Sequence, residues 1–193
     1  MKKKRLDVIT IVSGLPRSGT SLMMQMLEAG GMDILTDDVR KADEDNPKGY
    51  YEFEKIKNLE KDRSWLSQCE GKAVKIVSLL LYHLPKNRNY KIIFMKRNMQ
   101  EIIASQRRML QRLPRDGDDE NDEIIANKYQ NHLQKLEVWL EKQSHIDVLY
   151  ISYNDIIENP NESAEKIRRF LRNNLNVSAM VRVVKSSLYR QRK

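Results

Sequence analysis

Cysteine and histidine are scarce in this chain of 193 residues, and long apolar runs are missing from it. The only cysteine, Cys69, excludes an internal disulfide and a metal site built from several cysteines. The three histidines do not recur at a ligand spacing such as H-x-x-x-H; they are His83, His132 and His145. No apolar run reaches the length of about 18 residues that a membrane-spanning helix needs. We therefore expect neither a metal centre nor a membrane span.

The N-terminus carries a basic segment, "MKKKR", which is similar to the start of a signal peptide. The residues that follow, "LDVITIVSGLPRSG", contain an aspartate and reach a Gly/Pro loop too early for an export core. A basic tail over residues 1–6 that precedes the first strand is the better interpretation. With a single cysteine, this favours a cytoplasmic protein.

Positive charge exceeds negative charge, with 35 lysines and arginines against 27 acidic residues and a net charge of +8. Such a surplus is typical of proteins that bind nucleic acid, anionic membranes or polyanionic small molecules. The basic residues are spread along the sequence, and the two dense groups fall at the ends, in residues 1–6 and 186–193. We interpret both as tails, so charge alone does not indicate a nucleic-acid partner.

Strand and helix patterns alternate along the chain. β-Branched, apolar segments predict strands over 7–14, 32–37, 72–80, 90–98 and 145–153. Amphipathic segments predict helices over 20–31, 99–113, 123–143 and 161–173. This alternation predicts an α/β fold: a single P-loop-type domain over residues 1–193. Its central, mostly parallel sheet should have about four to five strands, with helices on both faces.

The segment "GLPRSGTS", residues 14–21, lies between the first strand and the first helix. Its spacing is that of a phosphate-binding loop, whose backbone N–H groups and helix N-terminus hold an anion. Thr20 replaces the usual lysine, which disfavours ATP hydrolysis and ordinary kinase chemistry. Arg17 restores a positive charge within the loop, and its planar fork suits an oxyanion. The alternative is a strand-to-helix turn in which the arginine is incidental.

A second group of polar residues follows the strand over 90–98. Arg97 lies at the end of that strand, and Ser105 comes eight residues later on the next helix. Eight residues bring the helix about 80° past two full turns, so both side chains can address the same crevice. Ligands of open α/β sheets bind in that position. An arginine and a hydroxyl there suit a second phosphate group.

Together these two segments resemble the sulfotransferases that use 3′-phosphoadenosine 5′-phosphosulfate. In that family the first loop binds the 5′-phosphosulfate, and the arginine and serine of the second segment bind the 3′-phosphate. The resemblance assigns the first role to Arg17, Ser18, Gly19, Thr20 and Ser21. It assigns the second role to Arg97 and Ser105. The family needs no bound magnesium, which agrees with a loop that lacks the usual lysine.

Two further segments agree with the resemblance. "VLYISYNDIIENP" is similar to the family's strand whose tyrosine approaches the adenine; this implies that role for Tyr153, with Asn154 where the family usually has glutamate. "KAVKIV" is similar to the strand whose lysine lies near the transferring group, which implies that role for Lys75. The resemblance extends over about residues 8–172.

The chain departs from the family pattern at two further places. Many members carry a histidine two residues after the strand lysine as general base, and Val77 stands there instead. The family's C-terminal Arg-Lys-Gly stretch is not recognisable, although Arg190 or Arg192 is available as a substitute.

The general base must then come from elsewhere in the chain. Glu52 in "NPKGYYEFE" is the first candidate because related members use a glutamate, Glu54 is the second, and a displaced His83 is the third. The alternative is that both glutamates are solvated carboxylates at a helix N-terminus.

The sequence therefore predicts a sulfotransferase in which Glu52 accepts the acceptor's proton and Arg17 and Lys75 stabilise charge. The acceptor is a hydroxyl or amine on a small molecule or carbohydrate, and the oligomeric state is open. One alternative is a P-loop kinase that acts on a small metabolite. The other is a non-catalytic nucleotide-binding protein that has kept the donor site.

Overall fold

The structure is a computed structural model that describes residues 8–37, 49–110 and 121–184. Both basic tails lie outside these ranges, as do Arg190 and Arg192. None of the helices within the described ranges is long and apolar enough to span a membrane.

Five strands form one sheet, in the order β2-β3-β1-β4-β5, and every neighbouring pair is parallel. The strands are β1 (Val8–Gly14), β2 (Ile34–Leu35), β3 (Ala73–Lys75), β4 (Asn89–Lys96) and β5 (Ile146–Ser152). The predicted α/β class and parallel sheet are confirmed. β1 lies at the centre and is almost wholly buried, as expected for a strand that is covered on both faces.

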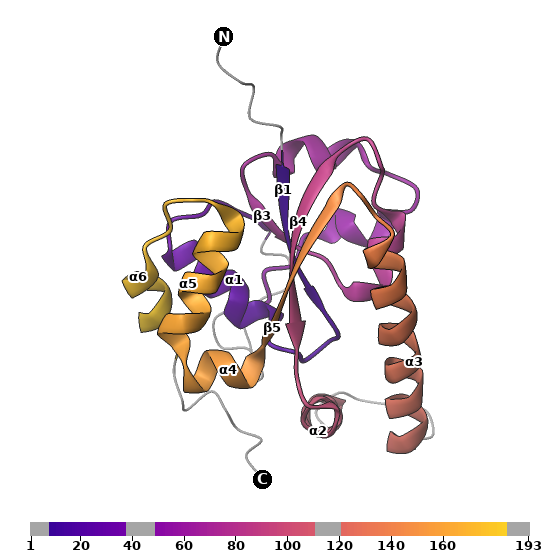
Figure 1. The fold of residues 1–193 in the computed structure, drawn as a ribbon. Coiled ribbons are helices and arrows are strands. Elements are labelled where there is room, and N and C mark those ends of the chain that lie inside the picture. Colours follow the sequence, from indigo (N-terminus) through magenta and orange to yellow (C-terminus); the bar gives the residue numbers. More distant parts are fainter. Residues whose placement is uncertain (1–7, 38–48, 111–120, 185–193) are drawn as a thin grey trace.

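Helices cover both faces of the sheet (Figure 1). One face packs against α1 (Thr20–Ala29), α4 (Tyr153–Glu158), α5 (Pro160–Leu171) and α6 (Val177–Arg182). The other face packs against α3 (Asp122–Glu141) and three short 3₁₀ helices, η1 (Glu54–Asn58), η2 (Ser64–Cys69) and η3 (Ser78–His83). α2 (Met99–Leu110) lies beyond the carboxyl end of β4, at the lower edge of the sheet in Figure 1. That edge is where ligands of parallel sheets bind.

β3 is much shorter than the strand predicted over 72–80. It pairs with β2 only through Ala73 and Val74, because β2 itself has two residues. After Lys75, Ile76 N still donates to Val12 O (3.0 Å), and the chain then turns into η3. The apolar run predicted a longer strand because it continues past Lys75 into η3.

β5 ends one residue earlier than predicted. The hydroxyl of Ser152 accepts hydrogen bonds from the backbone N–H groups of Asn154 (3.2 Å) and Asp155 (3.4 Å), and so caps α4. Tyr153 therefore begins a helix instead of ending a strand, and its side chain is buried.

A histidine ties α3 to η3. The Nε2 atom of His132 lies 2.9 Å from the hydroxyl oxygen of Ser78, which is buried at the start of η3. Burial lowers the pKa of the His132 imidazole below its ordinary value of 6.5. The unfolded chain, in which the imidazole is exposed, therefore binds a proton at a pH where the folded chain does not.

Acid should consequently destabilise the fold through His132. Its contribution to stability is complete above a pH of about 6.5 and is lost as the pH falls below that value, because the proton favours the unfolded state. We expect a His132→Gln variant to lose less stability than the wild type between pH 7.5 and pH 5.5 in urea unfolding. A His145→Gln variant should also lose less stability than the wild type, since burial and Lys86 lower the pKa of His145 as well. An equal loss in the wild type and in both variants would contradict the assignment.

Candidate functional site

The loop between β1 and α1 lies at the carboxyl edge of the sheet and has an unusual backbone. Arg17 adopts a φ of 68°, Gly19 a φ of 99° and Gly14 a φ of 151°, all in the region that favours glycine. Ser18 N donates to Leu15 O (3.2 Å), which closes a turn inside the loop. A non-glycine residue held at such a φ costs about 1–3 kcal/mol. The surrounding structure therefore fixes Arg17 in a conformation that it would not adopt alone.

The two glycines are needed because neighbouring groups approach closely. A Cβ atom on Gly14 would lie 2.5 Å from Ser18 Oγ and 2.7 Å from the carbonyl oxygen of Met95. A Cβ atom on Gly19 would lie 2.4 Å from the ring of Tyr153. Glycine at these positions lets β4 and the start of α4 pack directly against the loop.

Ser18 buries a hydroxyl within this loop. The residue is completely buried, and its Oγ atom has no hydrogen-bond partner among the residues that the structure describes. An unpaired buried hydroxyl costs free energy, so such groups call for an explanation in a ligand or in function. The loop therefore retains hydrogen-bonding capacity that suits an oxyanion.

The two segments that the sequence singled out meet at Arg17. Its Nε atom donates to Ser105 Oγ (3.0 Å) on α2, and its carbonyl oxygen accepts from Nη1 of Arg97 (3.1 Å) at the end of β4. The structure thus brings Arg17, Arg97 and Ser105 into one cluster, although 88 positions separate Arg17 from Ser105 in sequence.

Arg97 is held on further sides. Its Nε atom donates to Oε2 of Glu101 (2.8 Å), and its guanidinium carbon lies 4.3 Å from the centre of the Tyr153 ring. Glu101 in turn accepts a long hydrogen bond from Nδ2 of Asn154 (3.4 Å). Sequence reasoning missed Glu101, although a glutamate four residues after an arginine has the spacing of an ion pair.

Lys75 lies at the end of β3 with its side chain 9% exposed. Its Nζ atom donates to the carbonyl oxygen of Tyr50 and, at 3.5 Å, to Ser21 Oγ at the start of α1. The same atom lies 3.8 Å from Oε1 of Glu52, whose side chain is 32% exposed. Lys75 thus joins the loop–helix junction to the segment that carries Glu52.

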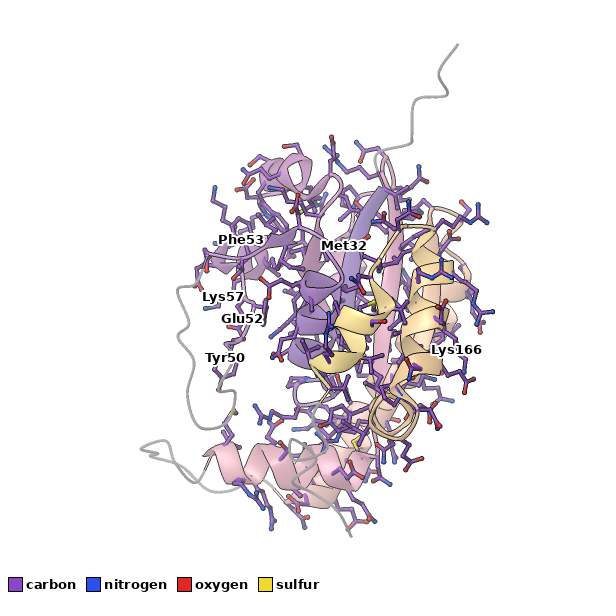
Figure 2. All side chains as sticks on the ribbon, turned by 90° about the vertical axis from the view of Figure 1, so that its left-hand side faces the viewer. Met32, Tyr50, Glu52, Phe53, Lys57 and Lys166 are labelled. Atoms are coloured by element: carbon purple, nitrogen blue, oxygen red, sulfur yellow. The ribbon has the colours of Figure 1, made fainter. Side chains whose placement is uncertain are left out.

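The segment from Tyr50 to Glu52 has a sharp change of direction. Tyr51 adopts a φ of 53°, and its hydroxyl donates to Glu28 on α1 (2.7 Å). The carbonyl oxygen of Glu52 accepts hydrogen bonds from Thr36 Oγ1 (2.9 Å) and Asp37 N (3.3 Å), just after β2. Figure 2 shows Tyr50, Glu52 and Phe53 along this stretch. These contacts place the Glu52 carboxylate beside Lys75.

The other two candidates for a base lie in different surroundings. Glu54 begins η1, where its backbone N–H donates to Asp37 and its carboxylate pairs with Lys57 (2.7 Å). That carboxylate is 53% exposed. His83 is the last residue of η3. Val77, at the position where the resemblance implies a histidine, is 39% exposed.

The site is rich in donors: the cationic side chains of Arg17, Lys75 and Arg97, all on loops or at strand ends, several hydroxyls, and the N–H groups that begin α1. Such a set suits an anion with several phosphate or sulfate groups. Among the described residues, no three His, Cys, Asp or Glu side chains gather in a way that would hold a metal ion.

Comparison with known proteins gives a family match. A model described as a sulfotransferase domain matches residues 7–193. The sulfotransferase domain of the olefin synthase from Synechococcus PCC 7002 superposes with a TM-score of 0.58 at 16% identity, over 96% of this chain and 80% of that one. Mouse sulfotransferase SULT7A1, complexed with PAP, superposes with a TM-score of 0.59 at 21% identity, over 94% of this chain and 63% of that one. The sulfotransferase domain from the curacin biosynthetic pathway superposes with a TM-score of 0.56 at 15% identity, over 94% of this chain and 79% of that one. At these identities the structural matches establish the fold.

Proposed function

The chain belongs to the sulfotransferase domain family, and on that premise we propose that it transfers a sulfuryl group from 3′-phosphoadenosine 5′-phosphosulfate to the hydroxyl or amine of an acceptor. The observation that carries the choice of donor is the cluster of Arg17, Arg97 and Ser105, which joins the phosphate-binding loop to α2. The donor has two separate anionic groups, and the described residues supply cationic and hydroxyl donors for both.

The residues fit this donor. The loop N–H groups, Ser18, Gly19, Thr20 and Ser21 would bind the 5′-phosphosulfate at the N-terminus of α1. Arg97 and Ser105 would bind the 3′-phosphate, and Tyr153, whose ring packs against Gly19 and Arg97, would lie near the adenine. The mouse sulfotransferase of similar fold was solved with PAP, which supports a donor of this kind.

On the acceptor side, we assign proton removal to Glu52. Its carboxylate would accept the proton of the acceptor hydroxyl or amine as that atom forms its bond to sulfur. The donor supplies an activated sulfuryl group, whose bond to the bridging oxygen breaks in the same transfer. A partly exposed carboxylate beside Lys75 is placed to meet both an entering acceptor and the reacting group.

Three groups would stabilise the charge that develops on the leaving oxygen. They are the ammonium group of Lys75, the guanidinium group of Arg17 and the N–H groups of the loop. Because these donors are already fixed by Tyr50, Ser21 and Ser105, little reorganisation is needed during transfer. We propose a small molecule or carbohydrate as the acceptor.

Calorimetric titration tests the donor. We expect adenosine 3′,5′-bisphosphate to bind in preference to ATP with magnesium, and the Arg97→Ala variant to bind the bisphosphate roughly 10- to 100-fold more weakly. The lost contact is a hydrogen bond between charged groups, of the kind worth about 1.5–3 kcal/mol. An Arg97→Lys variant, which keeps the charge, guards against loss of folding and should lose less affinity.

A preference for magnesium-ATP would overturn the proposal in favour of a P-loop kinase. Binding of the bisphosphate without transfer to any acceptor, phenols, sugars and amines included, would instead indicate a nucleotide-binding protein that has kept the donor site. This second outcome is included because Val77 replaces the histidine that many family members use as general base.

A further inference from the structure

A nearly buried carboxylate lies beside the residue to which we assign the 3′-phosphate. The side chain of Glu101 is 13% exposed and that of Arg97 is 8% exposed. Arg97 lies just before α2 and Glu101 in its first turn, and the two form an ion pair with 2.8 Å between Arg97 Nε and Glu101 Oε2. By charge alone, Glu101 should weaken the binding of an anion, because it offsets the positive charge of Arg97 and repels a phosphate.

The geometry suggests the opposite effect. Arg97 has five N–H donors in a rigid plane. Glu101 engages Nε and the carbonyl oxygen of Arg17 engages Nη1, while the ring of Tyr153 lies 4.3 Å from the guanidinium carbon. Nη2 has no hydrogen-bond partner among the residues that the structure describes. The guanidinium is thus held in one plane and one rotation, and it presents a single remaining edge to a ligand.

Glu101 is itself held from a second element. Nδ2 of Asn154, in the first turn of α4, donates to Glu101 Oε1 (3.4 Å). A glutamate or aspartate at position 154 would place a second negative charge against Glu101, whereas an amide donates to it. The chain Asn154–Glu101–Arg97 therefore connects the turn after β5 to the turn after β4.

We propose that Glu101, steadied by Asn154, is a positioning residue that aims Arg97 at the 3′-phosphate of the nucleotide. It determines the selectivity of the site for a 3′-phosphorylated nucleotide, although it carries the same sign of charge as the ligand. This inference rests on the proposed donor. The inference goes beyond the proposed donor, because it assigns the selectivity to a carboxylate that does not contact the nucleotide.

The test compares two ligands that differ only in the 3′-phosphate, adenosine 3′,5′-bisphosphate and adenosine 5′-monophosphate. For each protein, calorimetry gives the ratio of the two affinities. We expect Glu101→Gln to lower this ratio about 10-fold, because the charge-assisted hydrogen bond that fixes Arg97 is lost. The affinity for the monophosphate should stay the same, which a general loss of structure would not allow. Asn154→Ala should lower the ratio by a smaller factor.

A matched control is available on α5. Glu162 and Lys166 form an ion pair with the same spacing of four residues (2.8 Å), but both side chains are exposed. Figure 2 shows Lys166 far from Glu52. Glu162→Gln should leave both affinities unchanged. In an Arg97→Ala background, Glu101→Gln should no longer alter the ratio, because the residue that it positions is absent.

The outcomes separate the two proposals. If the wild type does not prefer the bisphosphate, the proposed donor is wrong and the role of Glu101 falls with it. If the wild type prefers the bisphosphate and Glu101→Gln keeps or increases that preference, the donor stands and the positioning role is overturned. An increase would mean that Glu101 acts only through its charge.

Discussion

Replacement of Glu52 by glutamine is expected to lower kcat for sulfuryl transfer about 10²–10⁴-fold, the usual effect of removing a general base. Glutamine has the same size as glutamate, and the carbonyl oxygen of residue 52 can still accept from Thr36 and Asp37. The amide side chain, however, cannot accept a proton. Affinity for adenosine 3′,5′-bisphosphate should change little, because Glu52 is not among the residues that we propose for the 3′-phosphate. The measurement is transfer of labelled sulfate to a hydroxyl acceptor, with bisphosphate binding measured alongside.

Glu54 provides the matched control for Glu52. The two carboxylates are two residues apart, yet Glu52 lies beside Lys75 while Glu54 pairs with the exposed Lys57. Glu54→Gln should therefore keep nearly the full rate. A large loss in Glu54→Gln with little loss in Glu52→Gln would move the base to Glu54. Activity retained in both variants but lost in His83→Ala would assign it to His83.

The parts of the molecule that depend on short-range pattern could be predicted from the sequence. The buried strands β1 and β4 are continuous apolar runs, and the loop after β1 has a fixed spacing of glycines and hydroxyls. The eight-residue spacing of Arg97 and Ser105 was enough to place both at one edge of the sheet. The structure adds that they meet through Arg17.

Features that depend on distant partners could not be predicted. β3 has a partner in β2 only at Ala73 and Val74, and β2 lies about 40 residues earlier in the chain. The place of Glu52 depends on the positive φ of Tyr51 and on backbone bonds to the segment after β2. Neither leaves a periodic signal in the sequence.

Glu101 is a different case, because it carried a signal that was not used. Its position, four residues after Arg97, has the spacing of an ion pair. The role of that pair depends on the orientation of Arg97, which the contacts of Arg97 with Arg17 and Tyr153 and of Glu101 with Asn154 determine. These partners are distant in sequence, so the sequence does not show them.

Replacement of Lys75 by methionine is expected to lower kcat about 10²–10³-fold, in line with the loss of one fixed donor to a developing negative charge. Methionine keeps most of the length of the side chain and suits its low exposure of 9%. The loss should fall on kcat, since charge on the leaving oxygen develops only in the transition state. Lys57→Met, which removes an exposed lysine paired with Glu54, is the control and should have little effect.

The interpretation of Lys75→Met depends on its neighbour, because Lys75 Nζ lies 3.8 Å from the Glu52 carboxylate and its loss alters the surroundings of that group. The double variant with Glu52→Gln separates the two roles. If the residues act in the same step, the double variant should be far less impaired than the product of the single losses predicts. Bisphosphate binding adds a second criterion, since Arg97→Ala should weaken it much more than Lys75→Met. Equal weakening by both would place Lys75 at the nucleotide instead of at the transferring group, and an unchanged rate would remove it from the mechanism.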